Sequence, residues 1–443
     1  MSHFAVIGPP LRGHYKPLSN LARELIDRGH QVTFIHHPDA QSLIEAEGAS
    51  FAPIGTDAPP VSRWTLPMAK IRGLIGLGGM MDGMVRFTDM FCREAPDVIR
   101  RIGADALIVD QLEAGGGLVA EHLGLPYASV ADTMPINRED GIPPPYVAWP
   151  YDPSDKGLKR NRGGWRVTDL LLRKVGKAIE ANARMLGLPA RRRLEDCLSP
   201  VLQLSQMVPS IDFPRRELPA TFHYTGPFRH GEAEDFEVPP GDERPLVYCA
   251  LGTLQGQRVE LFRKVAQACA DLDLRLLLTQ GGLSNVKRAA KLPGDPLVYD
   301  WVSQEGVLGH ADLIVCHGGI NTVLEPLAAG VPMVLMPLAF EQGAIAARME
   351  YAGAARELSF RSSAAKLAAA ISEVRGNPSF RAKARAIQQE MLAAGGVRRA
   401  VDLIERMPGV SAPKAGATTV PTAPDDVRGD SRSGSSSAAS RAR

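Results

Sequence analysis

A histidine and an aspartate that follow two separate apolar runs could together perform base catalysis. His14 comes soon after the run Phe4–Ile7, and Asp110 ends the run Ala106–Asp110. An imidazole, with an ordinary pKa of about 6.5, can take a proton from an alcohol near neutral pH, and a neighbouring carboxylate orients it and stabilises the cation that forms. His14 is therefore the predicted general base and Asp110 its partner. The alternative is that His14 caps a helix and Asp110 occupies a turn.

A second group of polar residues surrounds a pair of glycines in the C-terminal half. Gly318 and Gly319 come after the apolar run Leu313–Cys316 and precede a helical segment. A helix N-terminus offers unpaired N–H groups and a partial positive charge, which suit a diphosphate, and glycine allows the backbone to approach it. The polar side chains around this turn that could bind the rest of a nucleotide are Trp301, Gln304, His317, Asn321, Thr322 and Glu325.

Each of these residues also has a purely structural explanation. Trp301 could belong to a core, the two glycines could form a tight turn, and Glu325 could lie on a solvated helix face. The order in which they follow one another is what favours a nucleotide site, with the Trp301 ring stacked on a base and Glu325 accepting from ribose hydroxyls.

Two series of strand, helix and strand place these groups beyond strand ends, where parallel sheets bind ligands. The first series comprises strand Phe4–Ile7, loop Gly8–Tyr15, helix Pro17–Arg28, strand Gln31–His36, strand Ala106–Asp110, helix Gly116–Leu123 and strand Tyr127–Val130. The second comprises Leu246–Leu251, helix Val259–Leu272, Leu274–Thr279, Leu313–Cys316, helix Ile320–Ala329 and Val331–Met336. The predicted fold class is α/β, with two Rossmann-like doubly wound lobes facing a central cleft.

The chain is too long for one compact core, because single cores stop growing at roughly 250–300 residues. We expect an N-terminal lobe over residues 1–225 and a C-terminal, nucleotide-binding lobe over 246–407. Residues 226–245, rich in Gly, Pro and acids, form the predicted linker between them. Residues 408–443 are mostly Ala, Ser, Thr, Pro, Gly and Arg, which predicts a disordered tail.

Composition excludes several classes of protein. A net charge of +2 gives no reason to expect a nucleic acid partner, and the five cysteines form no CxxC pair that would hold zinc. Asp271 and Asp273 precede a strand, so we interpret them as a solvated turn and expect no metal or cofactor. The chain starts without a signal-type segment, and no apolar run reaches the roughly 18–20 residues that a membrane-spanning helix needs. These features favour a cytoplasmic protein.

The segment from Trp301 to Gln342 resembles the donor-binding segment of the inverting nucleotide-sugar glycosyltransferases of GT-B fold, a family that includes plant secondary-metabolite and bacterial natural-product enzymes. The matching positions are Trp301, Gln304, His317, Gly319, Asn321, Thr322, Glu325, Gly330, Pro332, Pro337, Glu341 and Gln342. Two departures exist: the spacing from Trp301 to His317 is shorter than in the plant enzymes, and Thr322 stands where serine is common.

This resemblance implies a role for each residue. Trp301 stacks on uracil, His317 contacts the phosphates, and Glu325 holds the ribose. Glu341 and Gln342 bind the sugar hydroxyls, in the pattern that fits glucose. The resemblance also implies that His14 is the base, that Asp110 supports it, and that Thr253 lies near the donor phosphates.

Stretches that lie mostly outside the donor segment resemble more closely the bacterial members that glucosylate carotenoid diols. These stretches are Met1–Phe4, Arg28–Ile35, Ile108–Gln111, Asp212–Arg215, Leu251–Gly256 and Pro337–Phe340. They imply UDP-glucose as donor and β-glucosylation of both terminal hydroxyls of zeaxanthin, or of a similar carotenoid diol, in two rounds. The alternatives are a same-fold transferase acting on a macrolide, sterol or flavonoid, and a catalytically inactive regulator that binds sugar nucleotides. A dinucleotide oxidoreductase is disfavoured because no GxGxxG follows the first strand.

Two further segments fit a lipophilic acceptor. Leu66–Phe91 is rich in methionine, whose flexible side chain adapts to irregular ligands. Lys156–Arg193 holds twelve lysines and arginines against two acidic residues, a balance that suits peripheral contact with an anionic membrane. An ordinary packed helix and an ordinary solvated helix are the respective alternatives.

Overall fold

The computed structural model describes residues 1–45, 49–56, 74–231, 235–252, 259–281, 292–339 and 341–411. Most of the predicted tail, residues 412–443, therefore lies outside the described residues. Within the described ranges, no helix is both long enough and apolar enough to cross a bilayer.

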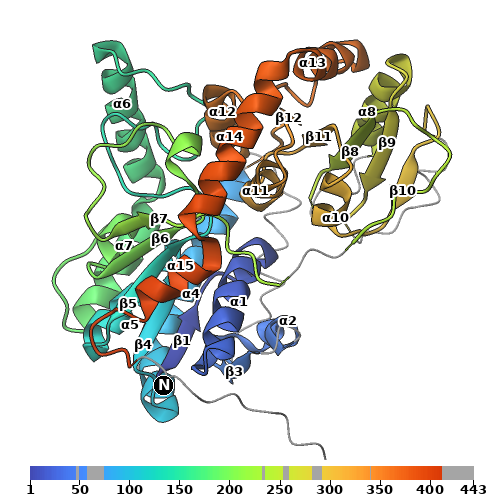
Figure 1. Ribbon diagram of the computed structural model, residues 1–443. Helices are drawn as coiled ribbons and strands as arrows, with labels where there is room; N and C mark the ends of the chain where they lie inside the picture. The colour runs from blue at the N-terminus through green and yellow to red at the C-terminus, as the bar shows by residue number, and fades with distance from the viewer. Residues whose placement is uncertain are drawn as a thin grey trace, which may run out of the picture. The chain divides into compact units, whose positions relative to one another are not determined.

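The N-terminal half builds a parallel sheet of seven strands in the order β3-β2-β1-β4-β5-β6-β7 (Figure 1). The strands are β1 (His3–Ile7), β2 (Gln31–His36), β3 (Ser50–Pro53), β4 (Ala106–Asp110), β5 (Tyr127–Ala131), β6 (Leu202–Ser205) and β7 (Phe222–Tyr224). The helices are α1 (Arg12–Asp27), α2 (Gln41–Glu45), α4 (Leu74–Ile102), α5 (Ala114–Leu123), α6 (Asp155–Leu171) and α7 (Arg173–Met185).

The C-terminal half builds a parallel sheet of six strands in the order β10-β9-β8-β11-β12-β13. The strands are β8 (Leu246–Ala250), β9 (Arg275–Thr279), β10 (Leu297–Tyr299), β11 (Leu313–Cys316), β12 (Met333–Leu335) and β13 (Ala355–Glu357). The helices are α8 (Val259–Asp271), α10 (Gln304–Leu308), α11 (Ile320–Ala328), α12 (Gln342–Ala352), α13 (Ala364–Gly376), α14 (Pro378–Ala394) and α15 (Gly396–Ile404). The two sheets confirm the predicted α/β fold class of two Rossmann-like lobes.

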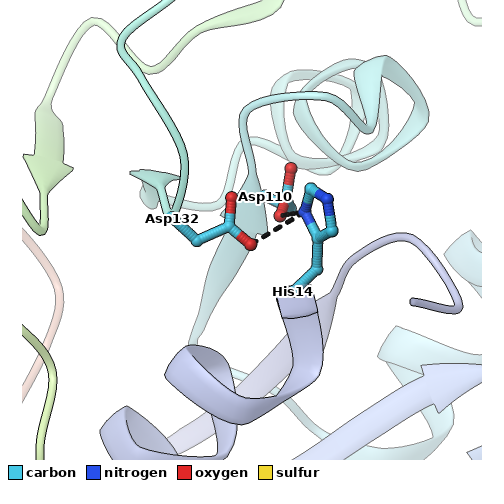
Figure 2. A group of neighbouring side chains, drawn as sticks. All are labelled: His14, Asp110 and Asp132. Carbon is cyan, nitrogen blue, oxygen red and sulfur yellow. Dashed lines mark hydrogen bonds and ion pairs between the residues drawn. The ribbon is translucent and has the colours of Figure 1, made fainter. Parts of the chain in front are cut away.

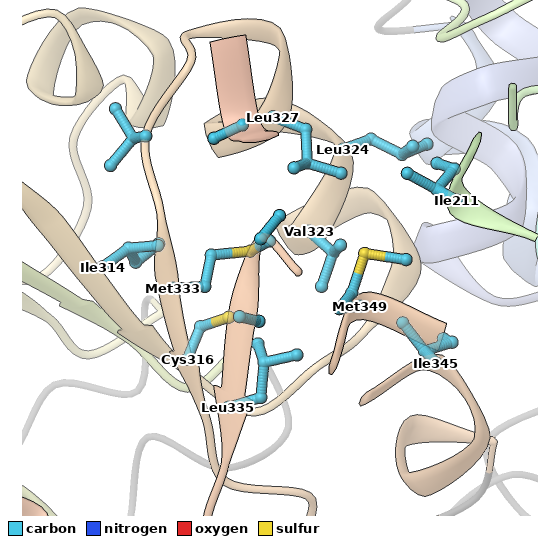
Figure 3. Packing of buried hydrophobic residues seen from close by; sticks show 14 of the residues in the cluster. Ile211, Ile314, Cys316, Val323, Leu324, Leu327, Met333, Leu335, Ile345 and Met349 are labelled. Atoms are coloured by element: carbon cyan, nitrogen blue, oxygen red, sulfur yellow. The ribbon is translucent and has the colours of Figure 1, made fainter. Parts of the chain in front are cut away.

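Both faces of each sheet are covered by helices, which is why central strands such as β1, β4, β8 and β11 are almost continuously apolar. Along β1, Phe4 faces the core shared with α1, and Ile7 faces the opposite core shared with α4, α5 and α7. In the second lobe, α11, α12 and α14 cover one face, and α8 and α13 cover the other. Figure 3 shows the core that α11, α12 and α14 cover, where Ile211 lies beside Leu324 of α11.

The last helix does not stay with the second sheet. In α15, Val397, Val401 and Ile404 are buried in the core formed by α1 and the first sheet. Arg28, at the end of α1, reinforces this contact through ion pairs to Asp402 and Glu405 at 2.7 and 2.9 Å. The chain thus returns to its first lobe after completing the second.

Helix α1 begins five residues before the predicted start at Pro17, so the expected loop Gly8–Tyr15 is shorter than predicted. Proline usually marks the first turn of a helix because it lacks an N–H. Here it lies inside the helix, and the backbone carbonyl of Gly13, which would have bonded to it, accepts instead from Asn321 Nδ2 at 2.7 Å.

Candidate functional site

The start of α1 carries the predicted base beyond the carboxyl end of the first sheet. His14 lies in the first turn of α1, and Asp110 is the last residue of β4, which pairs with β1. Nδ1 of His14 bonds to Oδ2 of Asp110 at 2.7 Å. The structure therefore brings together the two side chains predicted to act as a pair.

A second carboxylate, absent from the prediction, faces the same imidazole nitrogen (Figure 2). Asp132 follows β5, the strand beside β4, and its Oδ2 lies 2.8 Å from Nδ1 of His14. Both aspartates are fully buried, whereas 8% of His14 stays exposed. Since Nδ1 faces the carboxylates, Nε2 is the nitrogen left to meet an acceptor hydroxyl.

His14, Asp110 and Asp132 each shift the pKa values of the other two. Burial alone would lower the pKa of His14, but the charges of Asp132 and Asp110 outweigh it and raise that pKa well above its ordinary value. Burial, together with repulsion from Asp110, raises the pKa of Asp132 to about 8. Burial would also raise the pKa of Asp110, but the His14 charge and hydrogen bond lower it. Of the two carboxylic acids, Asp110 is therefore the one that ionises more readily, and Asp132 keeps its proton to higher pH.

These three residues also have the spacing of a metal site. Their possible ligand atoms all lie within 4.8 Å of one another, and no other such group occurs among the residues that the structure describes. One imidazole and two carboxylates could hold a divalent cation in principle. The sequence-based expectation that no metal is needed stays a prediction.

The predicted phosphate-binding turn is built around a tightly enclosed histidine. His317 follows β11, and burial lowers its pKa to about 4, so the ring is neutral. A side chain at Gly319 would place its Cβ 2.6 Å from Nε2 of His317, and one at Gly252 would lie 2.8 Å from Cε1. Gly252 and Gly318 also have φ values of +73° and +84°, which side chains disfavour. Glycine is thus required where the turn packs around the ring.

The side chain of Glu325 is a buried hydrogen-bond acceptor that is not fully paired within the described ranges. It lies on α11, and its Oε2 is buried with no hydrogen-bond partner in the described part of the chain. Burial and the nearby charge of Glu305 raise its pKa to about 7. A buried polar atom without a partner costs free energy, which hydroxyl groups of a bound ribose could recover.

The two residues predicted to bind the nucleobase, Trp301 and Gln304, lie just before α10 and at its start. Trp301 is 63% exposed, so its ring is not part of a core and one face can receive a ligand. Gln304 begins α10, and its Nε2 donates to the backbone oxygen of Thr322 at 3.4 Å. Asn321 instead contacts the first lobe, through Gly13.

Glu341 and Gln342 lie at the start of α12. The side-chain oxygen of Gln342 accepts from the backbone N–H groups of Leu338 and Ala339 at 2.9 and 3.0 Å. The side-chain oxygen is thus engaged, and the NH₂ group is the part of the side chain left to donate a hydrogen bond. Burial raises the pKa of Glu341, while the charge of His14 acts to lower it. Thr253, the remaining predicted donor contact, lies outside the described residues.

Comparisons with known proteins identify relatives over most of the chain. A model of the family "UDP-glucoronosyl and UDP-glucosyl transferase" matches residues 100–389. Zeaxanthin glucosyltransferase of Pantoea ananas is 37% identical over 414 residues, covering 92% of this chain and 96% of the relative. Zeaxanthin glucosyltransferase of Pseudescherichia vulneris is 38% identical over 410 residues, covering 92% and 98%. The crystal structure of the kitacinnamycin glycosyltransferase, 24% identical, aligns with a TM-score of 0.74 over 93% of this chain and 99% of that one, which shows a shared fold.

Proposed function

Because the chain belongs to the UDP-glucoronosyl and UDP-glucosyl transferase family, we propose that it transfers glucose from UDP-glucose to the terminal ring hydroxyls of zeaxanthin. The reaction would give a monoglucoside first and a diglucoside second. The observation that carries the chemistry is the buried contact between His14 and Asp110 at 2.7 Å. The names of the two bacterial relatives support the acceptor.

In the proposed mechanism His14 acts in its neutral form, in which Nδ1 carries the proton. Its Nε2 removes the proton of the acceptor hydroxyl as the hydroxyl oxygen attacks the anomeric carbon of glucose. The new carbon–oxygen bond forms on the face opposite the diphosphate, the bond to the diphosphate breaks, and UDP leaves with its electron pair. The configuration of the anomeric carbon is therefore inverted. Asp110 holds the imidazole by Nδ1 and stabilises the cation that develops.

The donor half of the site would stabilise the departing UDP. The N-terminus of α11 and the neutral His317 ring supply hydrogen-bond donors for the diphosphate. Glu325 would bind the ribose, Trp301 the uracil ring, and Glu341 with Gln342 the glucose hydroxyls. Gln304, Asn321, Thr322 and Gly319 would shape this half of the site around the nucleotide. No metal is required by this scheme.

Zeaxanthin is an apolar rod with one hydroxyl at each end, and it dissolves in lipid. We therefore propose that the enzyme meets its acceptor at an anionic membrane surface, to which it binds peripherally. The product must leave and turn round before its second hydroxyl can react. A monoglucoside should consequently be released early in a time course.

The purified protein, incubated with zeaxanthin in detergent micelles and a panel of UDP-sugars, tests the proposal by mass spectrometry of the products. We expect the mass of the monoglucoside and then of the diglucoside with UDP-glucose. Transfer to a macrolide, sterol or flavonoid but not to zeaxanthin would favour the alternative acceptors. Binding of UDP-glucose without transfer to any acceptor would favour an inactive regulator.

A further inference from the structure

The corner where α6 meets α7 presents apolar side chains to solvent. A single residue, Leu172, separates the two helices, which adjoin in the chain at the left of Figure 1. Val167, Leu170 and Leu171 are 56%, 67% and 42% exposed. They lie at positions i, i+3 and i+4, so they share one face of α6. That face is turned outward.

Helix α6 already has another face that packs on its own lobe. Trp165 and Thr168 are buried, and the Trp165 indole donates to the backbone oxygen of Ile142 at 3.0 Å. The outward apolar face is therefore additional to the one that holds the helix in place. An exposed cluster of large apolar side chains beside charged ones is typical of a surface that binds a partner or a membrane.

Cations surround this face. Arg166, Arg173 and Lys177 are exposed, and none of them forms an ion pair with any residue in the described ranges. We call the corner surface the set of Arg166, Val167, Leu170, Leu171, Arg173 and Lys177.

Several other cations of the basic segment Lys156–Arg193 form ion pairs away from this face. Arg191 pairs with Glu121 at 3.0 Å, Arg192 with Glu180 at 2.9 Å, and Arg193 with Asp169 at 3.7 Å. Three cations without such pairs thus lie beside the exposed apolar side chains, and two more exposed lysines, Lys156 and Lys159, lie in the first two turns of α6.

A hollow lined by both apolar and charged side chains continues inward from the corner. This hollow, of about 350 Å³, opens between α6 and α7, and its lining includes Trp165, Leu172, Val175 and Ile179. Arg173 and Lys177 also line it. The same lining reaches Ile136, four residues beyond Asp132, on the loop that leaves the catalytic group.

We propose that the corner surface is the part of the protein that docks on an anionic lipid bilayer. The three apolar side chains enter the boundary between headgroups and acyl chains, and the three cations meet lipid phosphates. The inference deepens the proposed function, since it rests on the acceptor being delivered from a membrane, and it assigns the contact to particular residues.

Sedimentation of the purified full-length protein with vesicles tests the charge contribution. We compare vesicles of phosphatidylcholine alone with vesicles that also contain phosphatidylglycerol. The triple variant Arg166→Gln, Arg173→Gln, Lys177→Gln should bind the anionic vesicles roughly a hundredfold more weakly, because each cation near such a surface contributes about fivefold. The matched control is Lys366→Gln, Arg375→Gln, Lys383→Gln, which removes three exposed cations of the second lobe and leaves the same net charge.

A single apolar change tests the insertion. Leu170→Gln should weaken binding about tenfold on anionic vesicles. Leu392→Gln is its control, because Leu392 on α14 is 68% exposed, against 67% for Leu170, and should leave binding unchanged. Circular dichroism of each variant verifies the fold.

Vesicle binding requires no substrate, so its outcome is separate from that of the transferase assay in micelles. Equal binding of wild type and corner variants to anionic vesicles would overturn the docking inference while leaving the transferase proposal intact. Equal losses in the corner variants and their controls would overturn it too. Failure to glucosylate zeaxanthin in micelles would overturn the proposed acceptor, whatever the vesicles show.

Discussion

At the scale of single residues, His14 has one nitrogen engaged by carboxylates and one free for chemistry. Replacing His14 with alanine removes the proton acceptor but touches no predicted contact to UDP. We expect turnover to fall by a factor of roughly 10² to 10⁴. The affinity for UDP, measured by calorimetry, should stay near that of the wild type. A His14→Ala enzyme with normal turnover would exclude His14 from the mechanism.

Asp132 and Asp110 should act together on the titration of His14. Both carboxylates favour the imidazolium, so removing either charge without changing its shape should lower the pH at which His14 loses its proton. We therefore expect Asp132→Asn and Asp110→Asn each to shift the His14 midpoint downward. NMR titration of histidine-labelled protein measures this, with the His14 resonance assigned from a His14→Gln spectrum.

Two other histidines provide an internal control for that titration. Burial holds the pKa of His36 at about 3 and that of His317 at about 4. Their resonances should show no titration between pH 6 and 9 in any variant, the range being chosen from the ordinary histidine value of about 6.5. If the His14 midpoint is the same in wild type and Asp132→Asn, the second carboxylate does not influence the base.

Replacing Glu325 should weaken the binding of UDP rather than slow the proton transfer. Glu325→Ala removes a buried carboxylate whose Oε2 has no partner in the part of the chain that the structure describes. We expect UDP binding to weaken by about 1–3 kcal/mol, the usual cost of leaving a buried hydrogen-bonding group, here a ribose hydroxyl, without its partner. Glu305→Ala is the control, because it removes the same charge one helix away and should not weaken UDP binding. Unchanged affinity in Glu325→Ala would mean that the ribose binds elsewhere.

At the scale of elements, the turn between β11 and α11 depends on space for the His317 ring. Gly319→Ala would bring a methyl group to 2.6 Å from Nε2 of that ring, so either the ring or the turn must move. We expect a loss of stability of about 1–3 kcal/mol, as overpacking typically costs, and weaker UDP binding. Gly309→Ala, whose nearest neighbour would be 3.4 Å away, should change neither. Denaturant unfolding and calorimetry distinguish the two variants.

The strands were the most predictable elements, because a strand buried on both faces is marked by its apolar composition alone. The bounds Gln31–His36 and Leu313–Cys316 agree with the structure. The start of α1 was wrong because Pro17 matches the usual first position of a helix. What permits the earlier start is the contact of Gly13 with Asn321, roughly three hundred residues later, which no local pattern reveals.

The part of the site formed by polar residues that follow apolar strands was predictable from their order along the chain. His14 and Asp110 each follow an apolar strand, and their contact requires only that β1 and β4 be neighbours. Asp132 gives the same signal, an acid directly after the run Tyr127–Ala131, and could have been found once β4 and β5 were paired. The roles assigned to the donor residues stay predictions.

At the scale of the whole molecule, the last described helix, α15, packs on the first lobe and so joins the end of the described chain to its beginning. Ile404 and Val401 are fully buried against the first sheet and α1, although they are separated from them in sequence by the entire second lobe. His30 adds a contact to Glu405 at 3.1 Å. The apolar spacing of α15 predicts a helix with one buried face, but it does not reveal which lobe covers that face.

Because α15 packs on the first lobe, the stability of that lobe depends on Ile404, which lies near the end of the described chain. Ile404→Ala should destabilise the protein by about 2–5 kcal/mol, since it removes three buried carbons and leaves a cavity. Hydrogen exchange of the α1 and β1 amides should accelerate by more than about tenfold, because these elements lose the helix that covers them. Leu392→Ala, at an exposed position on α14, should change stability by less than about 0.5 kcal/mol. Faster exchange confined to α13 and α14, with α1 protected as in the wild type, would show that α15 stabilises the second lobe instead.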